Sequence, residues 1–153
     1  MITIKPMFKL ALTATAVALV LAMGASGSPS PGKHPHYLHA LSDLREARAH
    51  LQRPDGGELR EQEREAIHAI DKAIGEIKKA SIDDGKNLND HPPVDNHMQW
   101  GGRLHRALEL LDSARRDCTQ EEDDPYARGL QARAIAHIDK ARHHVEEAIQ
   151  VVH

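Results

Sequence analysis

Residues 66–73 read Ala-Ile-His-Ala-Ile-Asp-Lys-Ala, and residues 134–141 repeat the pattern as Ala-Ile-Ala-His-Ile-Asp-Lys-Ala. The isoleucines lie three residues apart in both copies, which places them on one side of an α-helix. The stretches before the two copies also correspond, 67 positions apart, at Leu41 and Leu108, Leu44 and Leu111, Ala47 and Ala114, and Arg48 and Arg115. Such a repeat indicates one structural unit used twice, here a helical hairpin.

Apolar side chains recur every three or four residues in four segments, which is the period of a helix with one buried face. We expect helices at about residues 36–52, 58–81, 102–119 and 126–152. Turn residues separate the first two segments and also the last two, so each hairpin is antiparallel. The predicted fold class is therefore all-α, an antiparallel four-helix bundle from a duplicated helical hairpin, after a signal peptide. Its parts are hairpin one (36–81), a connection (82–102) and hairpin two (103–153), which together form a bundle over 36–153.

The first 27 residues have the organisation of a secretory signal peptide. Lys5 and Lys9 precede the apolar run 10–23, and small residues follow it at positions 24–27. An uncleaved anchor is the alternative, but the run is shorter than the roughly 20 residues that cross a bilayer. Residues 28–35 are rich in Ser, Pro and Gly and predict a flexible linker. We therefore expect a periplasmic or secreted protein with no membrane contact after signal cleavage.

Charge and motif content restrict the function. The full chain has 20 basic and 23 acidic side chains, and loss of Lys5 and Lys9 takes the net charge from −3 to 18 − 23 = −5. A nucleic-acid partner is therefore not expected, because such proteins carry a basic face. The sequence contains no nucleophile-elbow, HExxH, P-loop or dinucleotide-binding motif. We expect a non-enzymatic binding protein.

Histidine is abundant, with 12 residues. If the connection after the second helix stays at one end of the bundle, that end gathers most of them. The candidate metal ligands are His34, His36, His39, His91, His97, His105, His143 and His144, with His153 nearby. Imidazole suits zinc, copper or nickel, and such a site needs about three or four ligands. The leading hypothesis is thus a divalent transition metal bound at a histidine-rich end.

Other interpretations stay open. The histidines also suit a polar surface that gains charge near pH 6.5. The protein would then be a structural or stress-related protein-interaction module without a metal, binding a protein partner or a second copy. A haem or an anion bound in the core of the bundle is a third interpretation.

Two arginines, Arg48 and Arg115, interrupt the apolar faces of their helices, and Cys118 lies on such a face. Counting residues from the first turn places Arg48 level with Glu63, which predicts a buried ion pair, and an anion pocket lined by Arg48 and Arg115 is the alternative. Cys118 is the only cysteine and lies on the apolar face of its helix. We expect it to be buried, with a disulfide-linked homodimer as the alternative.

Two segments carry a resemblance to known sequences. They are His-Pro-His-Tyr-Leu-His-Ala-Leu-Ser-Asp-Leu-Arg at residues 34–45 and Asp-His-Pro-Pro-Val-Asp at residues 90–95. They resemble a group of uncharacterised small exported bacterial proteins, and the resemblance extends over most of the chain after the signal. It implies export and a helical fold, and it implies no particular chemistry.

Overall fold

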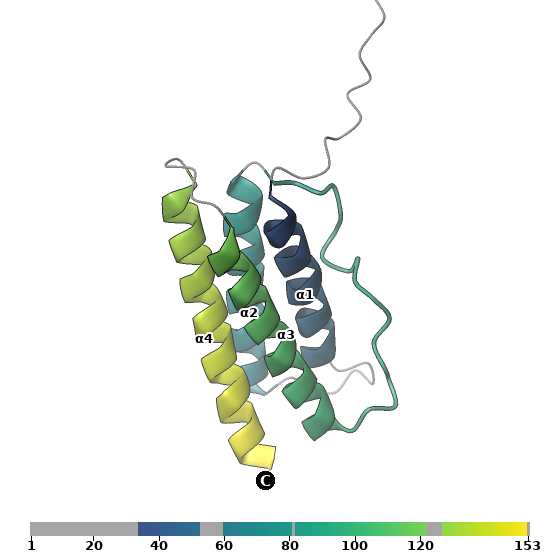
Figure 1. The fold of residues 1–153 in the computed structure, drawn as a ribbon. Helices are drawn as coiled ribbons and strands as arrows, with labels where there is room; N and C mark the ends of the chain where they lie inside the picture. Colours follow the sequence, from purple (N-terminus) through teal and green to yellow (C-terminus); the bar gives the residue numbers. More distant parts are fainter. Residues whose placement is uncertain (1–33, 53–59, 81, 122–126, 153) are drawn as a thin grey trace, which may run out of the picture.

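A computed structural model describes residues 34–52, 60–80, 82–121 and 127–152. These residues form four helices, α1 (Pro35–Leu51), α2 (Glu61–Lys79), α3 (Trp100–Gln120) and α4 (Arg128–Val152), shown in Figure 1. The predicted all-α class and the four-helix bundle are confirmed. Several predicted parts lie outside the described residues. They are the signal peptide (1–27), most of the linker (28–35), the turn between the first two helices (54–57) and His153.

The helix ends follow local sequence chemistry. Pro35 opens α1, where its missing N–H leaves no intrahelical hydrogen bond unmade. In α2, Glu61 and Glu63 occupy the first turn, and two lysines occupy the last turn, which complements the helix dipole. The Glu63 carboxylate also accepts a hydrogen bond from the backbone N–H of Arg60 at 2.8 Å. Glu63 therefore faces inward as expected, but its carboxylate caps the start of its own helix instead of pairing with Arg48.

The core consists of aliphatic side chains and alanines from matching positions of the two hairpins. In α1 and α3 the buried pairs are Tyr37 and Leu104, Leu44 and Leu111, Ala47 and Ala114, and Leu51 and Cys118. In α2 and α4 they are Ala66 and Ala134, Ile70 and Ile138, Ala73 and Ala141, and Ile77 and Val145. The apolar spacing in residues 126–152 also predicts that Val152 faces the core, and this is wrong, because Val152 lies in the exposed last turn of α4 and is 36% exposed.

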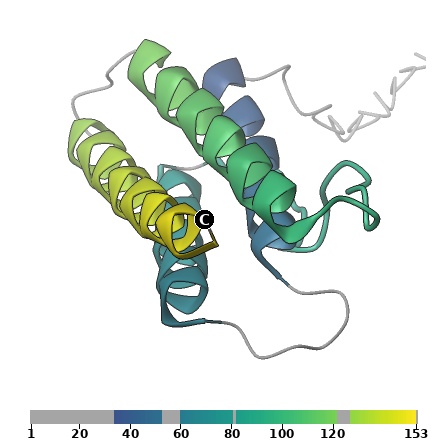
Figure 2. The same cartoon turned by 90° about the horizontal axis from the view of Figure 1, so that it is seen from below.

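The helices pack most closely as the pairs α1 with α3 and α2 with α4. Figure 2 shows the first pair on one side of the bundle and the second pair on the other. Arg103, at the start of α3, donates to the backbone carbonyls of Ala49 and Gln52 at the end of α1, at 3.0 and 2.6 Å. Helices α1 and α3 are therefore antiparallel.

Residues 82–99, which we call the strap, run along the length of the bundle from the end of α2 to the start of α3 (Figure 1). The bundle therefore has one long crossover connection. This differs from the prediction, in which the connection stayed at one end. None of the described helices combines the length and the apolar character that a membrane-spanning helix requires.

Candidate functional site

The strap is fastened to α1 by a buried ion pair. The Arg45 guanidinium donates to both carboxylate oxygens of Asp84 at 2.7 and 2.8 Å, and only 1% of the Arg45 side chain is exposed. Burial alone would raise the pKa of Asp84, but hydrogen bonds from Arg45 and from the Lys86 N–H outweigh it and lower this pKa. A two-pronged contact of this kind fixes orientation as well as distance. The pair thus holds the strap against the bundle.

A second buried carboxylate joins the start of α1 to the end of α3. Glu121 is 7% exposed, and one oxygen lies 2.7 Å from Nδ1 of His34. Its other oxygen accepts the backbone N–H of Tyr37 at 3.3 Å. The first N–H groups of a helix have no intrahelical acceptor, so a carboxylate stabilises this end of α1. Glu121 is therefore explained as a structural group.

The eight candidate ligands do not meet at one end. His34, His36 and His39 lie at the start of α1 beside the end of α3, where His36 Nδ1 is 3.7 Å from Asp117. His105 lies near the start of α3, at the opposite end, and its Nδ1 contacts the Gly101 carbonyl oxygen at 2.8 Å. The prediction of one histidine-rich end is wrong because the strap carries α3 to the other end of the bundle.

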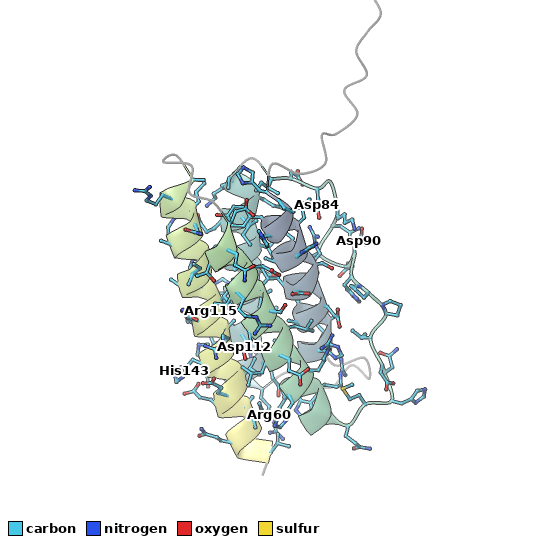
Figure 3. The ribbon with its side chains drawn as sticks, in the orientation of Figure 1. Arg60, Asp84, Asp90, Asp112, Arg115 and His143 are labelled. Carbon is cyan, nitrogen blue, oxygen red and sulfur yellow. The ribbon has the colours of Figure 1, made fainter. Side chains whose placement is uncertain are left out.

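The remaining candidates are separated as well. His91 and His97 lie on the strap, where His91 Nδ1 is 2.7 Å from the Pro92 carbonyl oxygen. His143 and His144 lie in the second half of α4, and two oxygens of Glu147 are 3.4 and 3.2 Å from their rings. Figure 3 shows His143 toward the end where α2 begins, away from Asp84. Within the described ranges, no three His, Cys, Asp or Glu side chains are placed to hold a metal ion.

Each hairpin carries an arginine–aspartate pair at a matching position. Arg48 Nε donates to Asp71 at 2.9 Å, and Arg115 Nε donates to Asp139 at 2.7 Å. The predicted pairing of Arg48 with Glu63 is therefore wrong, because Arg48 binds Asp71 and Glu63 accepts the backbone N–H of Arg60. Arg142 extends the second pair, since it lies 2.6 Å from Asp112 and 3.6 Å from Asp139. Carboxylates thus satisfy the arginines that were candidates for an anion pocket.

Cys118 is buried, as expected. Burial and the nearby carboxylates of Asp117 and Glu121 raise the pKa of its thiol to about 12. The thiolate is the reactive form of cysteine, so this side chain is chemically quiet at neutral pH. It is a core residue of α3.

Cations outnumber carboxylates on the part of the outer surface formed by residues 65–79 of α2 and 133–140 of α4, and we call this part the basic face. Its cations are Lys72, Lys79, Arg133 and Lys140, and its carboxylates are Glu65 and Glu76. Glu76 is 9% exposed and binds both Lys79 and Arg133, at 3.0 Å each. Burial first, and then Lys72, Lys140 and Lys79, lower the pKa of the neighbouring His137, while Glu76 raises it. The lysines therefore surround His137 closely enough to act on its charge.

The corresponding surface of α1 and α3, which we call the acidic face, has the opposite sign. Its carboxylates are Asp43, Glu46, Glu109 and Asp117, and its cations are Arg106 and the exposed Arg116, seven residues from Glu109 on the same side of α3. Arg106 lies 3.2 Å from both Glu46 and Glu109. Burial first, and then Asp117 and Glu46, raise the pKa of Asp43, against the lowering effects of Ser113 and Arg106. Four carboxylates outnumber two cations, so this face is negative.

Neither face was predicted from the sequence. Each combines residues from two helices that are not neighbours in the chain, and the pairing of α1 with α3 decides which side chains share a surface. A signal was present in α4, where Arg133, His137 and Lys140 are spaced by three or four residues and therefore share a side of the helix.

Comparison of the chain with protein-family models, with curated proteins and with solved structures finds no match.

Proposed function

We propose that the protein is an exported, non-enzymatic interaction module that binds charged macromolecular partners through its two outer faces. The observation that carries the proposal is the sorting of charge, with the basic face on α2 and α4 and the acidic face on α1 and α3. Complementary potentials steer encounter and select partners. The apolar run 10–23 and the signal-like order of residues 1–27 support export.

Duplication of a hairpin explains how such a module arose. The two arginine–aspartate pairs and the matched core positions support descent from one ancestral hairpin. Two copies of the hairpin bury their apolar faces against each other in a four-helix bundle, and outer positions are then free to differ between the halves. In this view the repeat supplies the scaffold and two cations of the basic face, Lys72 and Lys140, and unmatched charges supply the rest of the two faces.

The buried polar groups support a surface role over an internal reaction centre. Arg45 holds the strap, Glu63 caps α2, Glu121 holds the start of α1, and Arg103 binds carbonyls at the end of α1. Each of these groups therefore has a structural task.

Calorimetric titration with two model polymers tests the proposal. Poly-glutamate should bind the protein at low ionic strength, and the double variant Lys72→Glu/Lys140→Glu should lose at least tenfold in affinity. The matched control Lys86→Glu/Arg128→Glu makes the same change in net charge outside both faces, on the strap and on another side of α4, and should bind as the parent does. Equal weakening in both variants would mean that only net charge matters, and the proposal would fall.

A second candidate function is binding of a divalent transition metal, restricted to α4. The observation that favours it is the placement of His143 and His144 on two oxygens of Glu147, at 3.4 and 3.2 Å. As they lie, these three groups do not form a metal site, and an ion would have to move them to ligand distances of about 2.0–2.2 Å. Calorimetry with zinc on the protein and on His143→Ala/His144→Ala tests this candidate. Binding that the double variant leaves unchanged would exclude this location.

A further inference from the structure

We propose that the partner of the basic face is the acidic face of a second copy of this chain. The inference rests on the proposed function and names its partner. Both halves of the contact are present in one molecule, on opposite sides of the bundle (Figure 2). Opposite placement of complementary faces makes the contact heterologous, so association continues from copy to copy instead of closing as a two-fold dimer.

The charges on the basic face are accessible. The exposed fractions of the Lys79, Arg133 and Lys140 side chains are 65%, 55% and 52%. One of the two carboxylates of this face, Glu76, is 11% exposed and already binds two cations. The face therefore presents cations outward and keeps that carboxylate beneath them.

The acidic face is complementary in sign and arrangement. Glu109 is 69% exposed and Asp117 is 19% exposed, and both lie on α3. Asp43 and Glu46 flank them from α1, and Arg106 and Arg116 neutralise part of the charge. Docking one face on the other brings the excess cations of the first near the excess carboxylates of the second, which attract each other.

The dimensions of the faces limit the strength of the contact. The 17-residue α1 is about 25 Å long, and two adjacent helices are about 20 Å wide, which gives roughly 500 Å² per copy. Stable complexes bury about 800 Å² per partner. We therefore expect weak, reversible association that depends on charge and weakens with salt.

Sedimentation velocity at several protein concentrations tests the inference. At about 10 mM ionic strength, where the Debye length is about 30 Å, the weight-average sedimentation coefficient should rise with concentration. At about 1 M salt the Debye length is about 3 Å, and the protein should sediment as a monomer. A monomer under both conditions would overturn the inference.

Charge reversal identifies the faces. Lys72→Glu/Lys140→Glu gives a molecule with two acidic faces, and Glu109→Lys/Asp117→Lys gives one with two basic faces. Each variant alone should associate at least tenfold more weakly than the parent, and an equimolar mixture should associate again. Lys86→Glu/Arg128→Glu is the control, because both residues lie outside the two faces, and it should associate as the parent does.

Folding is checked by thermal melts, and the single reversals Lys72→Glu and Glu109→Lys replace any double variant that unfolds. Association that survives reversal of either face, or a mixture that stays monomeric, would contradict the inference. A monomeric protein that still binds poly-glutamate through the basic face would overturn the second-copy partner and leave the proposed function intact. Loss of both would remove the proposed function too.

Discussion

The two hairpins bury the same apolar positions but place their charged side chains differently. Hairpin one buries Arg45 at 1% and His50 at 2% exposure, whereas the matching positions in hairpin two, Asp112 and Asp117, are partly exposed. The strap covers Arg45, whereas the side chain of Asp112, at the matching position of α3, is 40% exposed. The difference teaches that repeated residues form the core, while an unrepeated residue, Arg45, fastens the crossover.

Loss of the ion pair between Arg45 and Asp84 should give the largest difference in stability between matched variants of the two hairpins. Asp84→Ala leaves the buried Arg45 guanidinium without its carboxylate, which should lower the free energy of unfolding by about 3–5 kcal/mol. The matched variant Asp112→Ala removes a carboxylate from Arg142, which is 29% exposed and keeps contacts to Asp139 and Glu146. That variant should cost under about 1 kcal/mol. Chemical denaturation measures both, and equal losses would contradict the difference in burial.

The shared core should give equal effects in the two halves. Ile70 and Ile138 are matched and fully buried, at 0% exposure each. Ile70→Ala and Ile138→Ala should each destabilise the protein by about 2–5 kcal/mol, through lost apolar contact and a residual cavity. Urea denaturation measures the free energy of unfolding of both variants. A loss well under 1 kcal/mol at either position would place that residue outside the common core.

The arginine–aspartate pairs should differ modestly in strength. The side chains of Arg48 and Asp71 are 16% and 36% exposed, and those of Arg115 and Asp139 are both 41% exposed. Double-mutant cycles to alanine should give coupling energies within about 0.2–1 kcal/mol, with the larger value for Arg48 and Asp71 because solvent screens it less. The reverse order would show that the extra contact from Arg142 to Asp139 outweighs burial.

His50, in hairpin one, should give the smallest effect, which is a dependence of the protein's stability on pH. Burial first, together with Arg103 and Arg106, lowers the pKa of His50, against the raising effect of Glu46. Below the unfolded value of about 6.5, the unfolded chain binds a proton that the folded chain excludes, so stability falls as the pH drops. When the pH drops from about 7.5 to about 5.5, the melting temperature of His50→Gln should therefore fall less than that of the parent. Parallel losses in the two proteins would assign the acid sensitivity to other groups.

The helices and their buried faces could be predicted from the sequence, because they depend on local patterns of residues. The spacing of Ile70, Ile74 and Ile77 is enough to define a helix and its buried face, and repetition at Ile138 marks the second half. Cys118 fell on the apolar stripe and is buried. Helix bounds agreed to within about three residues, because turn residues and helix-terminal charges are local signals.

The candidate site was predicted less well, because it depends on a long connection. Whether His105 lies beside His39 or at the opposite end depends on the path of the strap, which residues 82–99 do not reveal by composition. The strap is held by Arg45, a residue just off the apolar stripe that also suits a solvated face. Contacts such as Arg45 with Asp84, and the pairing of α1 with α3, are set by tertiary packing.

The central claim is that binding takes place on the charged outer faces and not at the histidines. Amide chemical-shift mapping with poly-glutamate and then poly-lysine tests it most directly. We predict that poly-glutamate shifts residues around Lys72, Lys79 and Lys140, and that poly-lysine shifts residues around Asp43 and Glu109. Perturbations centred instead on His34–His39 or on His143 and His144, or spread evenly over all four helices, would contradict the account.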